Sequence, residues 1–298
     1  MRRILGIFIG GAISLLVIST ASASTSTTVV VRPSAMHDWA VQTRDSNGTP
    51  VTPGTCANGA VNFVTNPTAP PMGVGSAELR TGNGTTGGDC SAELRNSGYN
   101  GVKLSSLTSL NYWTYDVVNN GSQFPYLELN ISTTGGTTPD DALFFEPPYQ
   151  QSGNGGACAN QAVTARNTWQ RWDAFNGCWW SNNGTLNPGT GTGTLADYLV
   201  AYPNATIVNT STAGAVHLVV GFASPTDQFV GNIDAFTIGV LGSETTYNFE
   251  PNLPSPTSKG QCKNGGWQNQ VDVSGTPFKN QGDCVSYVAT DGHNRGNG

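Results

Sequence analysis

The sequence is poor in charge, and poorest in positive charge. Charged residues make up 11% of the 298 residues, with 13 lysines and arginines against 19 acidic residues and only three histidines. The formal net charge is −6, and an acidic chain with few basic residues is repelled by nucleic acid phosphates and by anionic membranes. We therefore expect no nucleic acid partner.

Several motifs that would identify an enzyme or a metal site are also missing. The sequence has no Cys-x-x-Cys pair, no Gly-x-Ser-x-Gly elbow and no Glu-x-Asp-x-Glu alternation, and its histidines show no ligand spacing. In the densest acidic stretch, Asp140 and Glu146 share a face but stand roughly 20 Å apart, whereas Asp141 and Glu146 face opposite sides. Glycoside hydrolysis needs two carboxylates about 5 to 10 Å apart. Catalysis is therefore disfavoured, although carboxylates that meet across strands stay open.

Long apolar runs are absent beyond the first residues. Arg2 and Arg3 precede an apolar run over 4–18 and a small-residue stretch over 19–24, in which Ala21 and Ala23 fit the cleavage rule of secretory signal peptides. A membrane anchor is the alternative, but the run is short against the roughly 20 residues that a span needs. We predict a signal peptide over 1–23, no membrane span in the mature chain, and a secreted, extracellular protein.

The six cysteines are most simply read as three disulfide bonds, because an oxidising compartment forms and preserves them. The sequence does not fix the pairing. Proximity along the chain favours Cys56 with Cys90, Cys158 with Cys178, and Cys262 with Cys284, and the last pair is the best supported.

Glycine (38) and proline (17) are abundant and methionine (3) is rare, which suits strands joined by many turns. Between residues 24 and 250, short strand patterns alternate with turn residues, as in a β-sandwich or barrel. One short helix is predicted over 195–202, with Thr194 as its cap, Asp197 in its first turn and Pro203 at its end. A proline-rich linker over 251–258 then leads to a C-terminal segment, 259–298, which is too small to fold without a disulfide or docking.

Three stretches carry a resemblance: residues 61–79, Leu110-Asn-Tyr-Trp-Thr-Tyr115, and residues 229–250. They resemble uncharacterised secreted bacterial jelly-roll proteins, whose sandwiches are similar in kind to concanavalin-like and carbohydrate-binding-module domains. The resemblance implies an all-β, antiparallel jelly-roll-like sandwich and identifies no activity. Cys262-Lys-Asn-Gly-Gly-Trp267 and Phe278-Lys-Asn-Gln-Gly-Asp-Cys284 resemble a short two-cysteine motif at the C-terminus of many secreted bacterial proteins.

Sandwiches of this kind often hold a structural calcium ion, the one cofactor that the resemblance implies. Acidic residues near strand ends are the candidate ligands: Asp38, Asp234 and Glu250. The alternative is that these carboxylates are solvated or cap turns.

Sugar binding requires aromatic rings beside groups that bond hydroxyls, and alternation along the predicted strands provides such sets. Over 125–131, three apolar residues face one way and three polar or aromatic residues face the other; His217 likewise opposes the apolar face of 215–222. Trp169 and Trp172 cannot both be buried against the same layer in one regular strand, and Trp169 is the one predicted to be partly exposed. If their strands join one sheet, the candidate ligand-binding residues are Glu78, Arg80, Tyr126, Glu128, Asn130, Trp169, Arg171, Asp173 and His217. The alternative is an ordinary solvated sheet face.

These observations favour a secreted, non-catalytic β-sandwich that binds a glycan or a cell-surface polymer, with the C-terminal segment as an accessory. Two alternatives stay open. One is an extracellular polysaccharide-degrading enzyme whose carboxylates converge only in the fold, and the other is a structural envelope protein without a small ligand.

Overall fold

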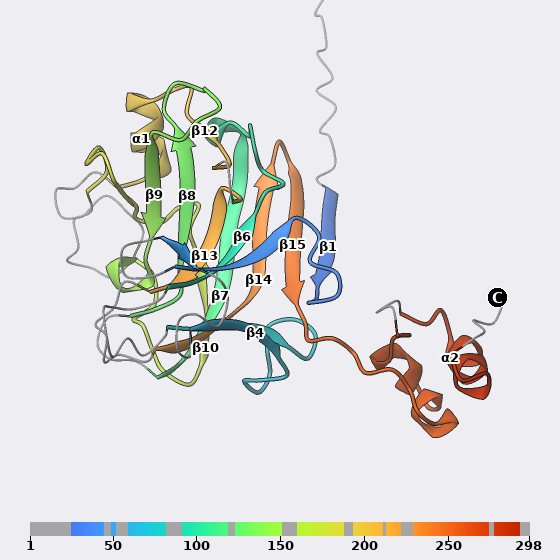
Figure 1. Cartoon of the computed structure of the whole chain (residues 1–298). Helices are drawn as coiled ribbons and strands as arrows, with labels where there is room; N and C mark the ends of the chain where they lie inside the picture. The colour runs from blue at the N-terminus through green and yellow to red at the C-terminus, as the bar shows by residue number, and fades with distance from the viewer. Residues whose placement is uncertain are drawn as a thin grey trace, which may run out of the picture.

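The computed structural model describes residues 25–44, 49–51, 59–81, 91–118, 123–150, 160–187, 193–210, 213–221, 229–273 and 277–292. The predicted signal peptide and three predicted disulfide cysteines, Cys56, Cys90 and Cys158, lie outside these residues. Within them the chain forms two β-sheets packed face to face, with a separate small segment at the C-terminus (Figure 1). The prediction of an all-β sandwich is confirmed.

The first sheet is built around one long strand, β14 (Val230–Val240). One edge of β14 pairs with β7 (Leu107–Val118), which pairs in turn with β10 (Trp169–Asp173). Along its other edge, the first part of β14 pairs with β5 (Ser76–Arg80) and the last part pairs with β15 (Ser243–Phe249). The outer strands are β4 (Ala60–Val64) beside β5 and β1 (Thr25–Val31) beside β15. β1 runs parallel to β15, which departs from a fully antiparallel sandwich.

The second sheet is antiparallel and carries the candidate site. Its order is β11 (Trp180–Ser181), β9 (Asp141–Phe145), β8 (Tyr126–Ser132), β13 (Val216–Val220), β6 (Ser91–Asn96), β2 (Trp39–Arg44) and β3 (Pro50–Val51), with β12 (Thr206–Ile207) also pairing with β8. The central strands β9, β8, β13 and β6 run side by side in Figure 1.

Strict alternation in β8 and β13 separates a core face from an outer face. Leu127, Leu129 and Ile131 of β8 are fully buried in the core, together with Val216 and Leu218 of β13. The outer face therefore takes the intervening residues of each strand, as the sequence predicted. Trp39 of β2 packs across the core against the first sheet. Its ring makes edge contacts with three aromatic residues of that sheet: Phe236, Tyr247 and Phe249.

The helix α1 (Leu195–Ala201) confirms the predicted short helix. The Thr194 side chain accepts a hydrogen bond from the Asp197 amide, and the Asp197 carboxylate accepts one from the Thr194 amide. This capping box satisfies donors that a helix start otherwise leaves unpaired. Tyr198 donates a hydrogen bond of 2.6 Å to Asp141 at the start of β9, so α1 is anchored to one end of the second sheet.

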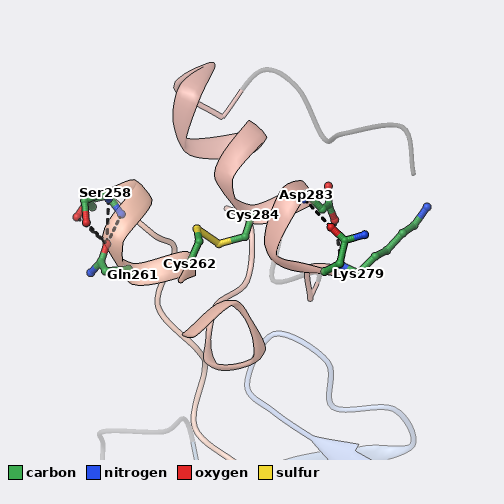
Figure 2. The surroundings of a disulfide bond; sticks show 8 residues. Ser258, Gln261, Cys262, Lys279, Asp283 and Cys284 are labelled. Carbon is green, nitrogen blue, oxygen red and sulfur yellow. Dashed lines mark hydrogen bonds between the residues drawn. A yellow bond between two sulfur atoms is a disulfide. The ribbon is translucent and has the colours of Figure 1, made fainter. Parts of the chain in front are cut away.

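The C-terminal segment holds a second helix, α2 (Gln281–Ala289), and two short 3-10 turns, η4 (Lys259–Cys262) and η5 (Gly266–Asn269). Figure 2 shows the disulfide between Cys262 of η4 and Cys284 of α2, which confirms this predicted pair. Cys178 is also disulfide-bonded. Two further 3-10 helices among the described residues are η1 (Leu104–Ser106) and η2 (Pro147–Gln150). No helix among the described residues is both long and apolar enough to cross a bilayer.

Candidate functional site

The outer face of the second sheet is hollowed into a cavity of about 450 Å³. This volume lies within the range of small-molecule sites, roughly 300 to 1,000 Å³. Its lining comes mainly from β2, β6, β8, β9 and β11: Arg44, Glu93, Arg95, Gln123, Phe124, Tyr126, Glu128, Asn130, Ala142, Phe144, Glu146, Trp180, Asn182 and Gly221.

Strand register explains why these residues meet. Arg95 and Glu128 are both Cα partners of His217, which lies between them on β13. Glu128 is in turn the partner of Phe144, and Phe144 is the partner of Trp180. Since directly paired residues point to the same face, one row of side chains crosses the floor of the cavity from β6 to β11.

Aromatic side chains form one end of the cavity. The rings of Phe144 and Trp180 are stacked with their centroids 4.0 Å apart and their planes 15° from parallel, and both residues are half-buried. Tyr126 contacts Phe144 at a centroid distance of 6.4 Å. A partly exposed aromatic platform beside polar groups is the arrangement that stacks on the apolar face of a sugar ring.

At the other end, Glu93 and Arg95 of β6 are buried together. Arg95 donates from Nε to one oxygen of Glu93, and the other oxygen receives Ser91 Oγ at 3.1 Å and lies 3.1 Å from Arg44 Nε. Both carboxylate oxygens of Glu93 are thus occupied. Burial lowers the pKa of Arg95, and Glu93 partly offsets this. Arg95 Nη1 is buried without a hydrogen-bond partner among the described residues, so it is a donor that water or a ligand in the cavity could satisfy.

Glu128 is the central carboxylate of the floor. Its Oε1 lies 3.2 Å from His217 Nδ1, and 15% of its side chain is exposed, whereas the His217 side chain is fully buried. His217 Nε2 lies 2.6 Å from the Gly214 carbonyl oxygen and 3.1 Å from Asn130 Nδ2. Burial by itself would raise the pKa of Glu128, but His217, Arg95 and Arg44 hold that pKa below its ordinary value.

Glu146, directly after β9, is a second carboxylate in the same cavity. Its Oε1 accepts a hydrogen bond of 2.7 Å from Trp180 Nε1. Burial raises its pKa above the ordinary value, and the Trp180 bond lowers it in part. One cavity therefore holds two carboxylates whose surroundings shift their pKa values in opposite directions.

The nine predicted ligand-binding residues fall into two groups on opposite sheets. The second sheet holds four of them: Tyr126, Glu128, Asn130 and His217. All but His217 line the cavity, and His217 contacts Glu128 from the neighbouring strand. The other five are on the first sheet: Glu78 and Arg80 on β5, and Trp169, Arg171 and Asp173 on β10. The condition for a shared groove, that the strands of all nine residues join one sheet, is not met, because sequence alternation fixes the face of each strand but not the sheet that the strand joins.

The first-sheet group has contacts of its own. Arg80 Nε bonds Glu78 Oε1 at 2.6 Å, and Trp169 packs on Tyr115 at a centroid distance of 5.6 Å. Trp169 is half-buried while Trp172 is fully buried, which confirms the predicted difference between them.

The three candidate calcium ligands do not converge. Asp234 accepts backbone hydrogen bonds from Met72 at 2.9 Å and Phe249 at 3.1 Å, and Glu250 accepts one from Val74 at 2.9 Å. Asp38 lies at the start of β2 in the other sheet, and no cluster of three acidic, histidine or cysteine side chains suited to a metal occurs in the part of the chain described. The two buried carboxylates instead tether the loop before β5.

Sequence reasoning missed Glu93, Arg95, Glu146, Phe144 and Trp180. Glu93 and Arg95 carried a usable signal, since they alternate with Ala92 and Leu94 in a short strand pattern. The sequence analysis compared the position of Glu146 only with those of Asp140 and Asp141. The neighbours of Glu146 on β8 and β11 depend on strand pairing, which cannot be read from the sequence.

No protein-family model matches this chain, and neither a curated protein nor a solved structure is significantly similar to it.

Proposed function

We propose that this protein is secreted and binds a glycan in the cavity on the outer face of its second sheet. The observation that carries the proposal is the placement of the stacked Phe144–Trp180 pair beside Glu128 and Asn130 in a cavity of about 450 Å³. The rings offer a surface for the apolar face of a sugar, and the carboxylate and amide groups can bond its hydroxyls.

The charges of the cavity favour a neutral glycan over an acidic one. Both arginines that line it, Arg44 and Arg95, contact the carboxylate of Glu93. Glu128 and Glu146 add acidic groups to the same lining. A uronate or sulfate would therefore meet a surface without surplus positive charge.

The binding test uses two tryptophans in similar settings on opposite sheets. Trp180 and Trp169 are both half-buried and each contacts one other aromatic ring. In a screen of neutral and acidic polysaccharides, we expect Trp180→Ala to weaken binding about tenfold or more, equivalent to about 1.4 kcal/mol, and Trp169→Ala to leave it unchanged. Equal affinities for wild type and Trp180→Ala, or no binding to any polysaccharide, would remove the proposal.

Secretion is supported by the leader pattern and by the Cys262–Cys284 disulfide, which persists in oxidising compartments. N-terminal sequencing of the protein recovered from the culture medium should begin at Ser24. Recovery of the full-length chain from the cell interior would contradict it.

A further inference from the structure

Two carboxylates of the cavity, Glu128 and Glu146, lie diagonally across the β8–β9 pair. Glu128 of β8 is the partner of Phe144 of β9, and Glu146 follows two residues later, directly after the end of β9. Diagonal neighbours of this kind have Cα atoms roughly 7 to 8 Å apart. Strand pairing thus brings two acids close to one another, which the spacing of acids along a single strand does not.

The contacts of each carboxyl group hold the two apart. Glu146 is bonded to Trp180 on β11, while Glu128 lies against His217 on β13. Since β11 and β13 flank the β9–β8 pair on opposite sides, each carboxyl group is held away from the other. Inverting glycosidases hold their two carboxyl groups roughly 6.5 to 9.5 Å apart and retaining ones roughly 5 Å apart, so carboxyl groups held away from one another favour inversion.

The remaining oxygen of each carboxyl group is available. Glu93 has both oxygens bound, but the contacts of Glu128 and Glu146 within the described chain involve only Oε1 of each. Burial raises the pKa of Glu146, whereas His217 and the two arginines hold the pKa of Glu128 below its ordinary value despite burial. Acid–base hydrolysis uses two carboxyl groups whose surroundings shift their pKa values apart in this way.

We propose that this cavity hydrolyses a glycosidic bond of a neutral glycan with inversion, using Glu146 as the general acid and Glu128 as the general base. Glu146 gives its proton to the glycosidic oxygen as the bond from that oxygen to the anomeric carbon breaks. Glu128 takes a proton from a water molecule whose oxygen forms the new bond to the same carbon. The products are a free alcohol and a hemiacetal, and solvent returns the proton from Glu128 to Glu146. The activity rests on the proposed function, because a glycan must first occupy the cavity.

The experiment measures binding and cleavage on the same samples. Wild type, Glu146→Gln and Glu128→Gln are incubated with the polysaccharide retained best in the binding screen, at pH 4 to 7, and new reducing ends are counted. We expect either variant to lose about 10²- to 10⁴-fold in rate while it still binds the polysaccharide, because the Gln carbonyl oxygen can still accept from a hydroxyl group. Glu78→Gln, which removes a half-buried carboxylate from the other sheet, should match wild type.

Two further readouts separate chemistry from misfolding. Proton NMR of the first product should show the anomeric configuration opposite to that of the substrate. With a 4-nitrophenyl glycoside, whose leaving group needs little protonation, Glu146→Gln should lose far less activity than on the natural linkage, whereas Glu128→Gln should lose as much.

Binding without new reducing ends in wild type would overturn the hydrolysis and leave the binding proposal standing. Absence of binding as well would overturn both. Retained configuration in the product, or an unchanged rate in Glu128→Gln, would also overturn the assignment.

Discussion

At the scale of single residues, Trp180 lowers the pKa of the Glu146 carboxyl group. Its indole N–H donates to the Glu146 carboxyl group, and this bond lowers a pKa that burial raises. Because a hydrogen bond to the charged form stabilises that form, removing the donor should raise the pKa further.

Trp180→Phe keeps an aromatic ring on Phe144 and removes the donor. We expect an upward shift of the Glu146 pKa, because the charged form of its carboxyl group loses a hydrogen-bond donor. Carbon-13 NMR titration of the Glu146 carboxyl carbon measures it, with Trp169→Phe as the control. A lower or unchanged pKa would contradict the role given to Trp180.

Asp234 is a second residue with an unusual protonation state. Burial is the main cause that raises its pKa to about 7, and the nearby Glu250 raises it as well, while three backbone hydrogen bonds lower it. The folded state therefore binds a proton at a pH where the unfolded chain, with an Asp pKa of about 3.9, does not.

The sign of this linkage gives a pH dependence. Because the folded pKa is the higher one, the contribution of Asp234 to stability grows as pH falls from 8 towards 5 and declines as pH rises through 7. Thermal unfolding of wild type and Glu250→Gln across this range should show a smaller gain in the variant, since one source of the shift is removed. An equal or larger gain in Glu250→Gln would contradict the coupling between the two acids.

At the scale of elements, α1 depends on its first residues. With only seven residues, from Leu195 to Ala201, the helix is too short to be stable from its own backbone bonds. The capping box at Thr194 and the anchoring of Tyr198 on Asp141 provide what its length does not.

Thr194→Ala should lower the free energy of unfolding by about 1 kcal/mol, because the amide of Asp197 loses its acceptor. Thr194→Ser keeps the hydroxyl group and should stay within about 0.5 kcal/mol of wild type. Urea unfolding of the three proteins tests this, and an effect of Thr194→Ser equal to that of Thr194→Ala would show that the hydroxyl is not what matters.

At the scale of the whole molecule, the C-terminal segment has its own small core. Cys262, Phe278, Cys284 and Tyr287 are buried together, and the rings of Phe278 and Tyr287 lie 5.2 Å apart. This cluster is separate from the large core that the two sheets share. Figure 1 shows the segment beside the sandwich and joined to it by the stretch after Glu250.

Replacing both Cys262 and Cys284 by alanine should therefore unfold the segment and leave the sandwich folded. The disulfide closes a sequence separation of 22 residues, and its loss costs about 3 kcal/mol, more than so small a core can supply. Amide hydrogen exchange should show loss of protection in α2 and unchanged protection in β13. Loss of protection in both would mean that the segment and the sandwich unfold as one unit.

The sequence by itself determined the elements whose signals are local. Thr194 and Asp197 specified the start of α1, and alternation in residues 125–131 and 215–222 specified both faces of β8 and β13. The proximity of the last two cysteines favoured their disulfide without fixing it. These features depend on neighbours within a few residues or on a short closed loop, so the residues themselves carry the information.

Only the tertiary structure decided which strands lie beside one another, and with that the site. Glu128 and Glu146 are 18 positions apart, and Arg95 is further from both, yet strand pairing sets the three in one cavity while Trp169 and Glu78 are placed on the opposite sheet. The physical reason is that strand order follows from packing the whole hydrophobic core, which every strand shares. The polar face acquires its arrangement as a consequence of that packing.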